Sequence, residues 1–207
     1  MNCDRIAPFY RMFETLAFGT RLQHHRLVFL DAAANKHRAL ILGDGDGRFT
    51  QALTCAYPTL PIDSVDLSPG MLIQARRRLL TNPNVSLTHA DALKFPFPVA
   101  TYDILFTHFF LDCFNPEDLA TLIPRISQSL CPKGTWIITD FRQAPGGWRS
   151  IYTRAWLNIM YSFFYLATGL KTRHLASYCE ELRAAHFTLL QERISHDGLI
   201  TSQHWQR

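Results

Sequence analysis

The sequence predicts an α/β protein with a doubly wound, mostly parallel sheet of seven strands. Short apolar runs alternate with amphipathic stretches along most of the 207 residues, which is typical of parallel strands joined by crossover helices. The first apolar run ends in a glycine turn at 43–47, and the second ends in an acid, Asp66. A glycine turn that opens a helix, followed by an acid after the next strand, is the pattern of a nucleoside-binding half-site.

The predicted elements follow one another in a regular order. Residues 1–36 form an N-terminal helical lid of one or two amphipathic helices, broken near Gly19. Strands are predicted at 38–42, 61–66, 85–89, 102–108 and 135–141, with helices at 48–56, 70–80, 116–130 and 174–185. Two β-rich runs, 187–194 and 199–206, complete the sheet. We expect a single domain over 1–207, made of the cap, a cofactor-binding core at 37–147, an apolar helical insert at 148–186 and a terminal hairpin at 187–207.

Residues able to bind a ligand stand where the predicted strands end. They are Gly43, Asp66, Asp91 and His108. Ligands bind doubly wound sheets at the carboxyl ends of the strands, near the point where the strand order reverses. We therefore expect these residues to converge on one site. Glycine in the turn lets the backbone approach a ligand that a Cβ would keep away, and the acid can accept both hydroxyls of a ribose.

The composition argues against nucleic-acid, metal and disulfide chemistry. The net charge is +4, and the basic residues are scattered except for a run at 76–78, which is typical of a solvated helix face. The five cysteines show no C-x-x-C spacing and the nine histidines show no ligand pattern, so we expect no metal. An odd, scattered cysteine set is typical of a reducing compartment, and the N-terminus shows no secretory signal. The sequence therefore predicts a cytoplasmic location.

Together these motifs resemble the class I S-adenosylmethionine-dependent methyltransferases, whose fold is Rossmann-like. The resemblance covers nearly the whole chain and is carried by 43–47, 65–72, 91–92, 102–103 and 132–134. It implies S-adenosyl-L-methionine as the cofactor, with the glycine turn beside its methionine part and the acid after strand two on its ribose. The residues implied to bind the cofactor are Gly43, Asp44, Gly45, Gly47, Asp66, Leu67, Met71, Asp91, Ala92 and His108, of which Met71, Asp91 and Ala92 face the adenine.

The glycine motif departs from that family in one place. The family carries an acid two residues before the first glycine, where this chain has Ile41. Asp44 and Asp46 lie inside the turn instead, where they can meet the positive charge of the cofactor or cap the following helix. The G-D-G-D-G spelling is also similar to aminopropyltransferases, which use decarboxylated S-adenosylmethionine, but the paired acids of those enzymes are absent from 107–110. A non-catalytic, cofactor-binding regulator also stays open.

Two apolar segments are candidates for the substrate side. The N-terminal segment is similar to the entry helix of ubiquinone/menaquinone C-methyltransferases, where Tyr10 matches an aromatic that closes over the cofactor. The insert at 148–170 is too short and interrupted for a membrane span and too apolar for an ordinary surface helix. A substrate lid is favoured, with a buried helix or a helix resting on a membrane surface as alternatives. The expected substrate-binding residues are Phe109, Asp140, Trp148, Trp156 and Tyr161.

Methyl transfer requires alignment of the acceptor atom, the methyl group and the leaving sulfur, and it requires a base only if the acceptor loses a proton. His108 is the first candidate base because the ordinary pKa of histidine suits proton acceptance at neutral pH. Asp112 is the second, as a base or as the group that orients His108, and Tyr10 and Asp140 follow. Structural roles are open for both leading candidates, with His108 as a core histidine and Asp112 as a cap of the helix that starts near Asn115.

The sequence therefore predicts methyl transfer to a small or lipid-like acceptor with an apolar or aromatic body. The run Phe109–Cys113 departs from the F-G-L-R-N run of the quinone methylases, so no quinone is specified. The N/D-P-P-Y-type loop of enzymes that methylate nucleic-acid bases is absent after strand four, which argues against nucleic acid as a partner. The methylated atom and the oligomeric state are not specified by the sequence.

Overall fold

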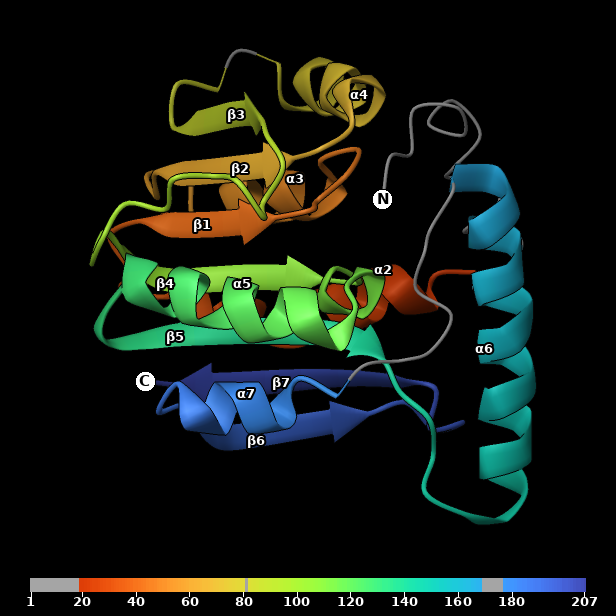
Figure 1. Cartoon of the computed structure of the whole chain (residues 1–207). Helices are drawn as coiled ribbons and strands as arrows, with labels where there is room; N and C mark the ends of the chain where they lie inside the picture. Colours follow the sequence, from red (N-terminus) through yellow and green to blue (C-terminus); the bar gives the residue numbers. More distant parts are fainter. Residues whose placement is uncertain (1–18, 81, 169–176) are drawn as a thin grey trace.

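The computed structural model describes residues 19–80, 82–168 and 177–207, which contain one seven-stranded sheet (Figure 1). The strands are β1 (Ala39–Leu42), β2 (Ile62–Asp66), β3 (Val85–His89), β4 (Tyr102–His108), β5 (Leu130–Phe141), β6 (Thr188–Ile194) and β7 (Ile200–Gln206). Their order is β3-β2-β1-β4-β5-β7-β6, with β7 antiparallel to both of its neighbours and every other pair parallel. This topology confirms the predicted doubly wound, mostly parallel fold, in which β7 is the reversed strand.

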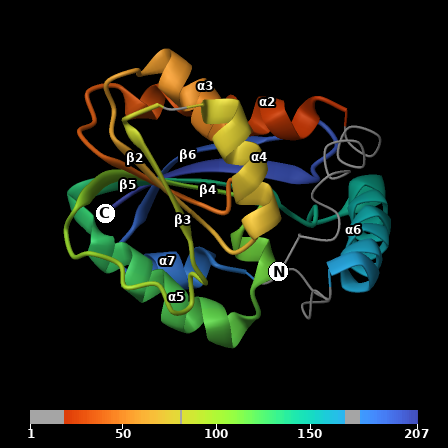
Figure 2. The same cartoon turned by 90° about the horizontal axis from the view of Figure 1, so that it is seen from above.

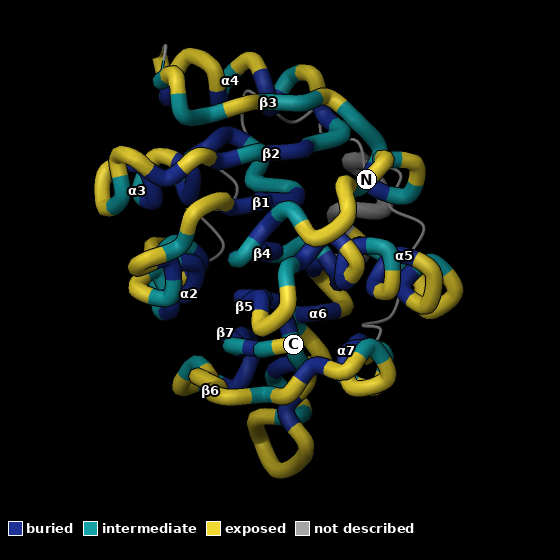
Figure 3. Tube along the Cα trace, turned by 90° about the vertical axis from the view of Figure 1, so that its left-hand side faces the viewer, coloured by how far each residue is buried: buried dark blue, intermediate teal, exposed yellow. Residues whose placement is uncertain are grey.

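Helices cover both faces of the sheet (Figure 2). On one side lie α2 (Arg21–Leu27), the short 3₁₀ helix η1 (Leu30–Ala33), α3 (Arg48–Ala56) and α4 (Pro69–Leu79), and on the other lie α5 (Pro116–Ser129) and α7 (Cys179–Ala184). Each side of the sheet has its own apolar core. Phe49 of α3 and Phe106 of β4 belong to one core, and Leu122 of α5 and Trp136 of β5 belong to the other. The central strands are therefore buried, whereas the outer helix sides are exposed (Figure 3).

Side-chain caps explain where two of the helices begin. The Ser68 hydroxyl accepts a hydrogen bond from the Met71 amide at 3.2 Å, and Pro69 occupies the first turn of α4. The Asn115 side chain does the same for the Asp118 amide at 2.8 Å, with Pro116 opening α5. Asn115, and not Asp112, therefore caps α5, while Asp112 lies in the short 3₁₀ helix η2 (Leu111–Cys113).

Strand β5 begins earlier than the sequence predicts. Leu130 was expected at the end of a helix, but it pairs with Tyr102 of β4, and the pairing then shifts in register before Ile104 meets Thr135. Lys133 has a φ of 62° within this irregularity. The run Pro132–Gly134 indicates a turn in the sequence, and the structure accommodates it as a distortion inside the strand.

The insert forms one helix, α6 (Gly147–Thr168), between β5 and α7. In Figure 1 it stands across the edge of the sheet toward which the arrows of β1, β2 and β4 point. Leu157 and Met160 on α6 pack with Leu22, Phe141 and Ile200 in a third apolar cluster. Within the described ranges, no helix is long and apolar enough to cross a membrane.

Candidate functional site

The glycine turn at the end of β1 is built from left-handed backbone. Gly43, Gly45 and Gly47 have φ values of 73°, 64° and 79°. A Cβ on Gly43 would lie 2.5 Å from the Phe110 ring, and one on Gly47 would lie 2.9 Å from the Ala75 Cβ of α4. Glycine is therefore required at both positions by conformation and by space. The strand order reverses between β1 and β4, so this turn stands at the place where doubly wound sheets bind ligands.

Asp66 ends β2 and reaches the glycine turn. Its Oδ2 accepts a hydrogen bond from the Gly45 amide at 3.0 Å, and its Oδ1 accepts one from the Ser68 amide at 2.8 Å. These contacts fix the carboxylate beside the turn, across 21 residues of sequence. A carboxylate only accepts hydrogen bonds and has about four acceptor positions, a chemistry that suits the hydroxyls of a ribose.

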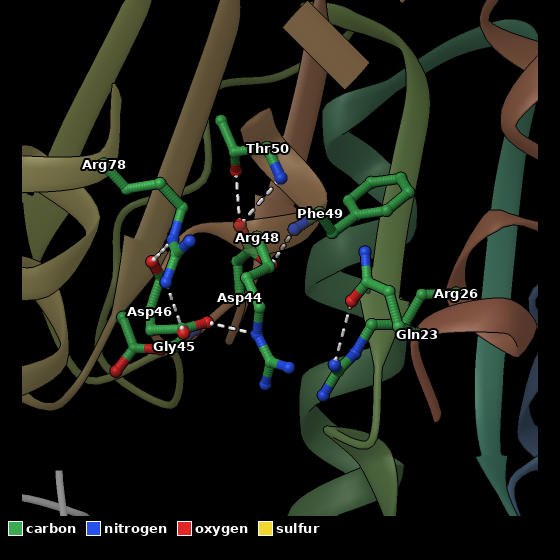
Figure 4. A network of polar contacts seen from close by, with 10 residues as sticks. Gln23, Arg26, Asp44, Gly45, Asp46, Arg48, Phe49, Thr50 and Arg78 are labelled. Atoms are coloured by element: carbon green, nitrogen blue, oxygen red, sulfur yellow. Dashed lines mark hydrogen bonds and ion pairs between the residues drawn. The ribbon is translucent and has the colours of Figure 1, made fainter. Parts of the chain in front are cut away.

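The two acids inside the turn have structural partners (Figure 4). The Asp44 carboxylate accepts hydrogen bonds from the Thr50 amide at 2.9 Å, the Thr50 hydroxyl at 2.5 Å and the Phe49 amide at 3.3 Å, so it caps the start of α3. Burial raises the pKa of Asp44 to about 6. Asp46 forms ion pairs with Arg48 and with Arg78 of α4. Asp46 therefore joins α3 to α4.

The predicted adenine side lies beside β2 and β3. Met71 is buried in the first turn of α4, and a Cβ on Gly45 would lie 3.8 Å from its Sδ. Asp91 follows β3 and accepts a hydrogen bond from the Leu93 amide at 3.0 Å, and Ala92 is buried beside it. The Leu67 carbonyl lies 3.0 Å from Nε2 of His89, which ends β3. The structure thus gathers the turn, Asp66 and Met71, with Asp91 at the end of the neighbouring strand.

His108 is buried at the end of β4 against the ring of Phe49, 4.3 Å away between ring centroids. Neither ring nitrogen has a hydrogen-bond partner among the residues that the structure describes. Burial, with the positive charge of Arg26 as a second cause, lowers the pKa of His108 well below its ordinary value. The imidazole is therefore neutral at pH 7, with two buried polar atoms available to a ligand.

Asp112 and Asp140 form a buried acidic pair on the α5 side of the sheet. Burial raises the pKa of Asp112 to about 6. Burial and then the charge of Asp112 raise the pKa of Asp140 well above its ordinary value. The Phe110 amide donates to Asp140 at 3.1 Å, and the Cys113 thiol lies 3.5 Å from Asp112 Oδ1. No hydrogen bond between Asp112 and His108 is found in the part of the chain that the structure describes, so the expected orienting role stays a prediction.

The structure adds one residue that sequence reasoning missed. Arg26 of α2 is 8% exposed and lies over the Phe109 ring at 5.2 Å. Its charge acts on both Asp44 and His108, which places a buried cation next to the glycine turn. Nothing in the N-terminal sequence distinguishes Arg26 from other arginines, because the helix that carries it has no motif.

The expected substrate residues fall into different environments. Phe109 has a φ of 54° directly after β4, and its ring packs on Phe141 at 4.8 Å. Trp156 is half-buried on α6 and packs against the third cluster, as Phe109 and Cys113 also do, whereas Trp148 is 64% exposed. Trp148 therefore faces solvent. Tyr161 lies in α6 but its side chain is not described, and Tyr10 lies outside the described residues.

No group of three or more His, Cys, Asp or Glu side chains that could hold a metal ion occurs within 19–80, 82–168 and 177–207. The arrangement is a cradle made of glycine backbone, a carboxylate and apolar walls. The sheet topology defines a Rossmann-like fold, and this cradle lies at the carboxyl ends of its strands, where such folds bind ligands.

Comparisons with known proteins agree with this class. Residues 39–134 match the model of a methyltransferase domain family. The chain is 39% identical over 97 residues to a trans-aconitate 2-methyltransferase of Methylobacterium nodulans, covering 47% of this chain and 35% of the relative. It is 30% identical over 148 residues to a demethylmenaquinone methyltransferase of Thermus thermophilus, covering 70% of this chain and 66% of the relative. These matches support a class I S-adenosylmethionine-dependent methyltransferase.

The fold is also shared with solved methyltransferase structures. One is the 1,6-didemethyltoxoflavin-N1-methyltransferase of Burkholderia thailandensis, with a TM-score of 0.66, 16% identity and coverage of 98% of this chain and 84% of that chain. That structure contains S-adenosylhomocysteine and 1,6-didemethyltoxoflavin. The chain spans only about a third of the length of the first curated relatives that it matches, with coverage of 35%, 31% and 41%.

Proposed function

We propose that this protein transfers a methyl group from S-adenosyl-L-methionine to a small or lipid-like acceptor with an apolar or aromatic body. The observation that carries the proposal is the contact between the Asp66 carboxylate and the Gly45 amide, next to a turn that excludes any Cβ at Gly43. This cradle fits the cofactor's nucleoside, because backbone can approach closely and a fixed carboxylate can accept the ribose hydroxyls. When bound, the cofactor supplies an activated methyl group on a sulfonium, so the protein contributes mainly alignment and exclusion of water.

Each part of the cradle has a proposed contact. Asp66 and the Leu67 backbone hold the ribose, and Met71 with Asp91–Ala92 borders the adenine. The glycine turn borders the methionine part, where Arg26 supplies the positive charge that a carboxylate needs. Asp44 contributes by holding the turn on α3, since its carboxylate is occupied by Thr50 and Phe49.

Two residues are proposed to serve the acceptor in different ways. Asp112 takes up the acceptor's proton where one must be lost, because its pKa of about 6 keeps it ionised yet basic near neutral pH. Asp140 beside it, whose pKa is raised by burial and by the charge of Asp112, is proposed to position Asp112. His108 offers its unpartnered ring nitrogens as hydrogen-bonding atoms, since its lowered pKa makes it a weak proton acceptor.

The substrate cover is proposed to be α6 together with the N-terminal lid segment that contains Tyr10. Trp156 of α6 and Phe109 after β4 pack against the same apolar cluster, which supports a cover at the end of β4. An apolar wall at this place favours an acceptor with an aromatic or aliphatic body. A cytoplasmic location is proposed on the cysteine pattern alone.

The proposal is tested by measuring release of S-adenosylhomocysteine with a panel of phenols, hydroxylated quinone precursors, carboxylic acids and tertiary amines. For an acceptor that loses a proton, Asp112→Asn should lower kcat by about 100-fold or more. It should have little effect on a tertiary amine, which has no proton to lose. Asp118→Asn, at the exposed start of α5, is the matched control and should keep wild-type turnover. If the protein binds the cofactor but methylates no member of the panel or of a cell metabolite extract, the proposed methyl transfer is wrong and a non-catalytic, cofactor-binding regulator replaces it.

A further inference from the structure

Helix α6 has two unlike faces. Thr153, Leu157 and Met160 are buried, with exposed fractions of 0%, 5% and 7%. On the opposite side, Trp148, Ile151 and Ile159 are 64%, 75% and 63% exposed. Their spacing places them on one stripe of a helix with 3.6 residues per turn. We name Trp148, Ile151 and Ile159 the outer stripe. Leu80 and Val99, which are also strongly exposed, lie in turns outside α6.

The charged residues in this part of the chain are all basic. The segment from Phe141 to Cys179 contains five arginines and lysines and no acid. The rest of the chain holds 16 basic and 17 acidic residues, so the excess positive charge of the whole protein resides in this segment. Positive charge beside an apolar stripe complements a surface that is both anionic and apolar.

Two arginines border the outer stripe. Arg149 and Arg154 are exposed, and their helical positions lie on opposite flanks of the stripe. The Arg149 guanidinium lies 5.5 Å from the Trp148 ring centroid. Arginines that flank an apolar stripe can hold their charges at the level of lipid headgroups while the stripe enters the acyl boundary. Tryptophan is suited to the same boundary, because its ring is apolar and its N–H remains polar.

We propose that the outer stripe, with Arg149 and Arg154, is a binding face for the surface of an anionic lipid bilayer. A continuous helix that carries three large apolar side chains and no acid fits a bilayer better than an acidic protein partner, whose recognition rests on several paired charges. Helix α6 crosses the edge of the sheet where β1, β2 and β4 end (Figure 1). Binding through this face therefore brings the proposed acceptor side of the molecule to the membrane.

The tryptophans of the protein give a direct probe for this binding. Trp136 and Trp205 are fully buried, and Trp148 is the most exposed of the four. Unilamellar vesicles of phosphatidylcholine with phosphatidylglycerol should therefore shift the fluorescence of the whole protein to the blue, and flotation should recover the protein with them. Vesicles of phosphatidylcholine alone should bind about tenfold more weakly or less, and 0.5 M salt, used to screen the arginines, should weaken the anionic complex.

Matched variants identify the face. Ile151→Ser with Ile159→Ser should weaken vesicle binding about tenfold or more, because two apolar side chains no longer leave water. Arg149→Gln with Arg154→Gln should weaken binding to anionic vesicles by a similar factor and remove the salt dependence. Leu80→Ser with Val99→Ser removes equally exposed apolar residues elsewhere and should bind as wild type does. Far-ultraviolet circular dichroism confirms that each variant is folded.

Vesicle binding is independent of the proposed methyl transfer, so Asp66→Ala should bind vesicles normally even though its cofactor site is lost. The proposal is overturned if wild-type protein ignores anionic vesicles, or if the α6 variants bind them as tightly as the wild type. It is also overturned if the outer stripe instead retains an acidic carrier protein while vesicles are not bound.

Discussion

Replacing Gly47 by alanine should destabilise the protein more than the same change at any open glycine. The residue has a φ of 79°, which disfavours a side chain by about 1–2 kcal/mol. Its Cβ would lie 2.9 Å from the Cβ and 3.0 Å from the Cα of Ala75, so α3 and α4 must separate. Such overpacking costs about 1–3 kcal/mol. The free energy of unfolding should therefore fall by about 2–5 kcal/mol in total.

Gly147→Ala is the matched control, because Gly147 has a φ of 67° and nothing within 4 Å of its Cβ position. It carries the backbone penalty alone, about 1–2 kcal/mol. Urea unfolding of both variants, followed by circular dichroism, measures the difference. Adding Ala75→Gly to Gly47→Ala removes the closest contact and should show a favourable coupling in a double-mutant cycle. Equal losses for Gly47→Ala and Gly147→Ala would refute the argument that α4 packs against this turn.

Three further predictions test neighbouring parts of the site. Arg78→Ala removes one of two arginine partners of the buried Asp46 and should lower the free energy of unfolding by about 1–3 kcal/mol. Arg77→Ala, on the exposed side of α4, is the control and should change the free energy of unfolding by about 0.5 kcal/mol or less. Equal effects of the two variants in urea unfolding would contradict the ion pair between Arg78 and Asp46. In calorimetry, Arg26→Gln should weaken S-adenosylmethionine binding about tenfold and leave 5′-methylthioadenosine binding unchanged, because only S-adenosylmethionine has a carboxylate. Weaker binding of both ligands would contradict the proposed contact between Arg26 and that carboxylate. The raised pKa of Asp140 lowers stability as the pH rises above its unfolded-state pKa of about 4, because the unfolded state then releases a proton that the folded state retains. Asp140→Asn should therefore gain stability relative to wild type in urea unfolding as the pH rises above about 4, and a difference that stays constant across pH would refute the raised pKa.

The sequence predicted the central sheet well because its local signals agree with one another. Gly43, Asp66 and His108 each stand at the end of an apolar run, and the structure brings these strand ends to one edge because the strands are parallel. Gly47 illustrates the same agreement, since the glycine that the motif requires is also the residue that the contact with Ala75 requires.

Other features could not be predicted because they depend on partners that are distant in the sequence. The sequence could not decide between ligand contact and helix capping for Asp44, and the hydrogen bonds from Thr50 and Phe49 show the cap. The pairing of Asp112 with Asp140 joins η2 to the end of β5, and it alters both pKa values in a way that neither local sequence reveals. Arg26 lies near the glycine turn because α2 packs against α3, which the local sequence does not reveal. Trp148 faces solvent because the other side of α6 carries the buried residues.

The central claim is that the edge formed by the glycine turn and Asp66 holds S-adenosylmethionine. Calorimetric titration of S-adenosylmethionine and S-adenosylhomocysteine into the wild type, Asp66→Asn and Asp63→Asn tests it most directly. Asp63 lies on the same strand and pairs with Arg38 and Tyr102 away from the turn, so its variant controls for loss of a carboxylate from β2. We predict binding in the micromolar range for wild type and Asp63→Asn, and binding about 100-fold weaker for Asp66→Asn. Absence of binding to folded wild-type protein, or equal affinity for all three proteins, would contradict the account.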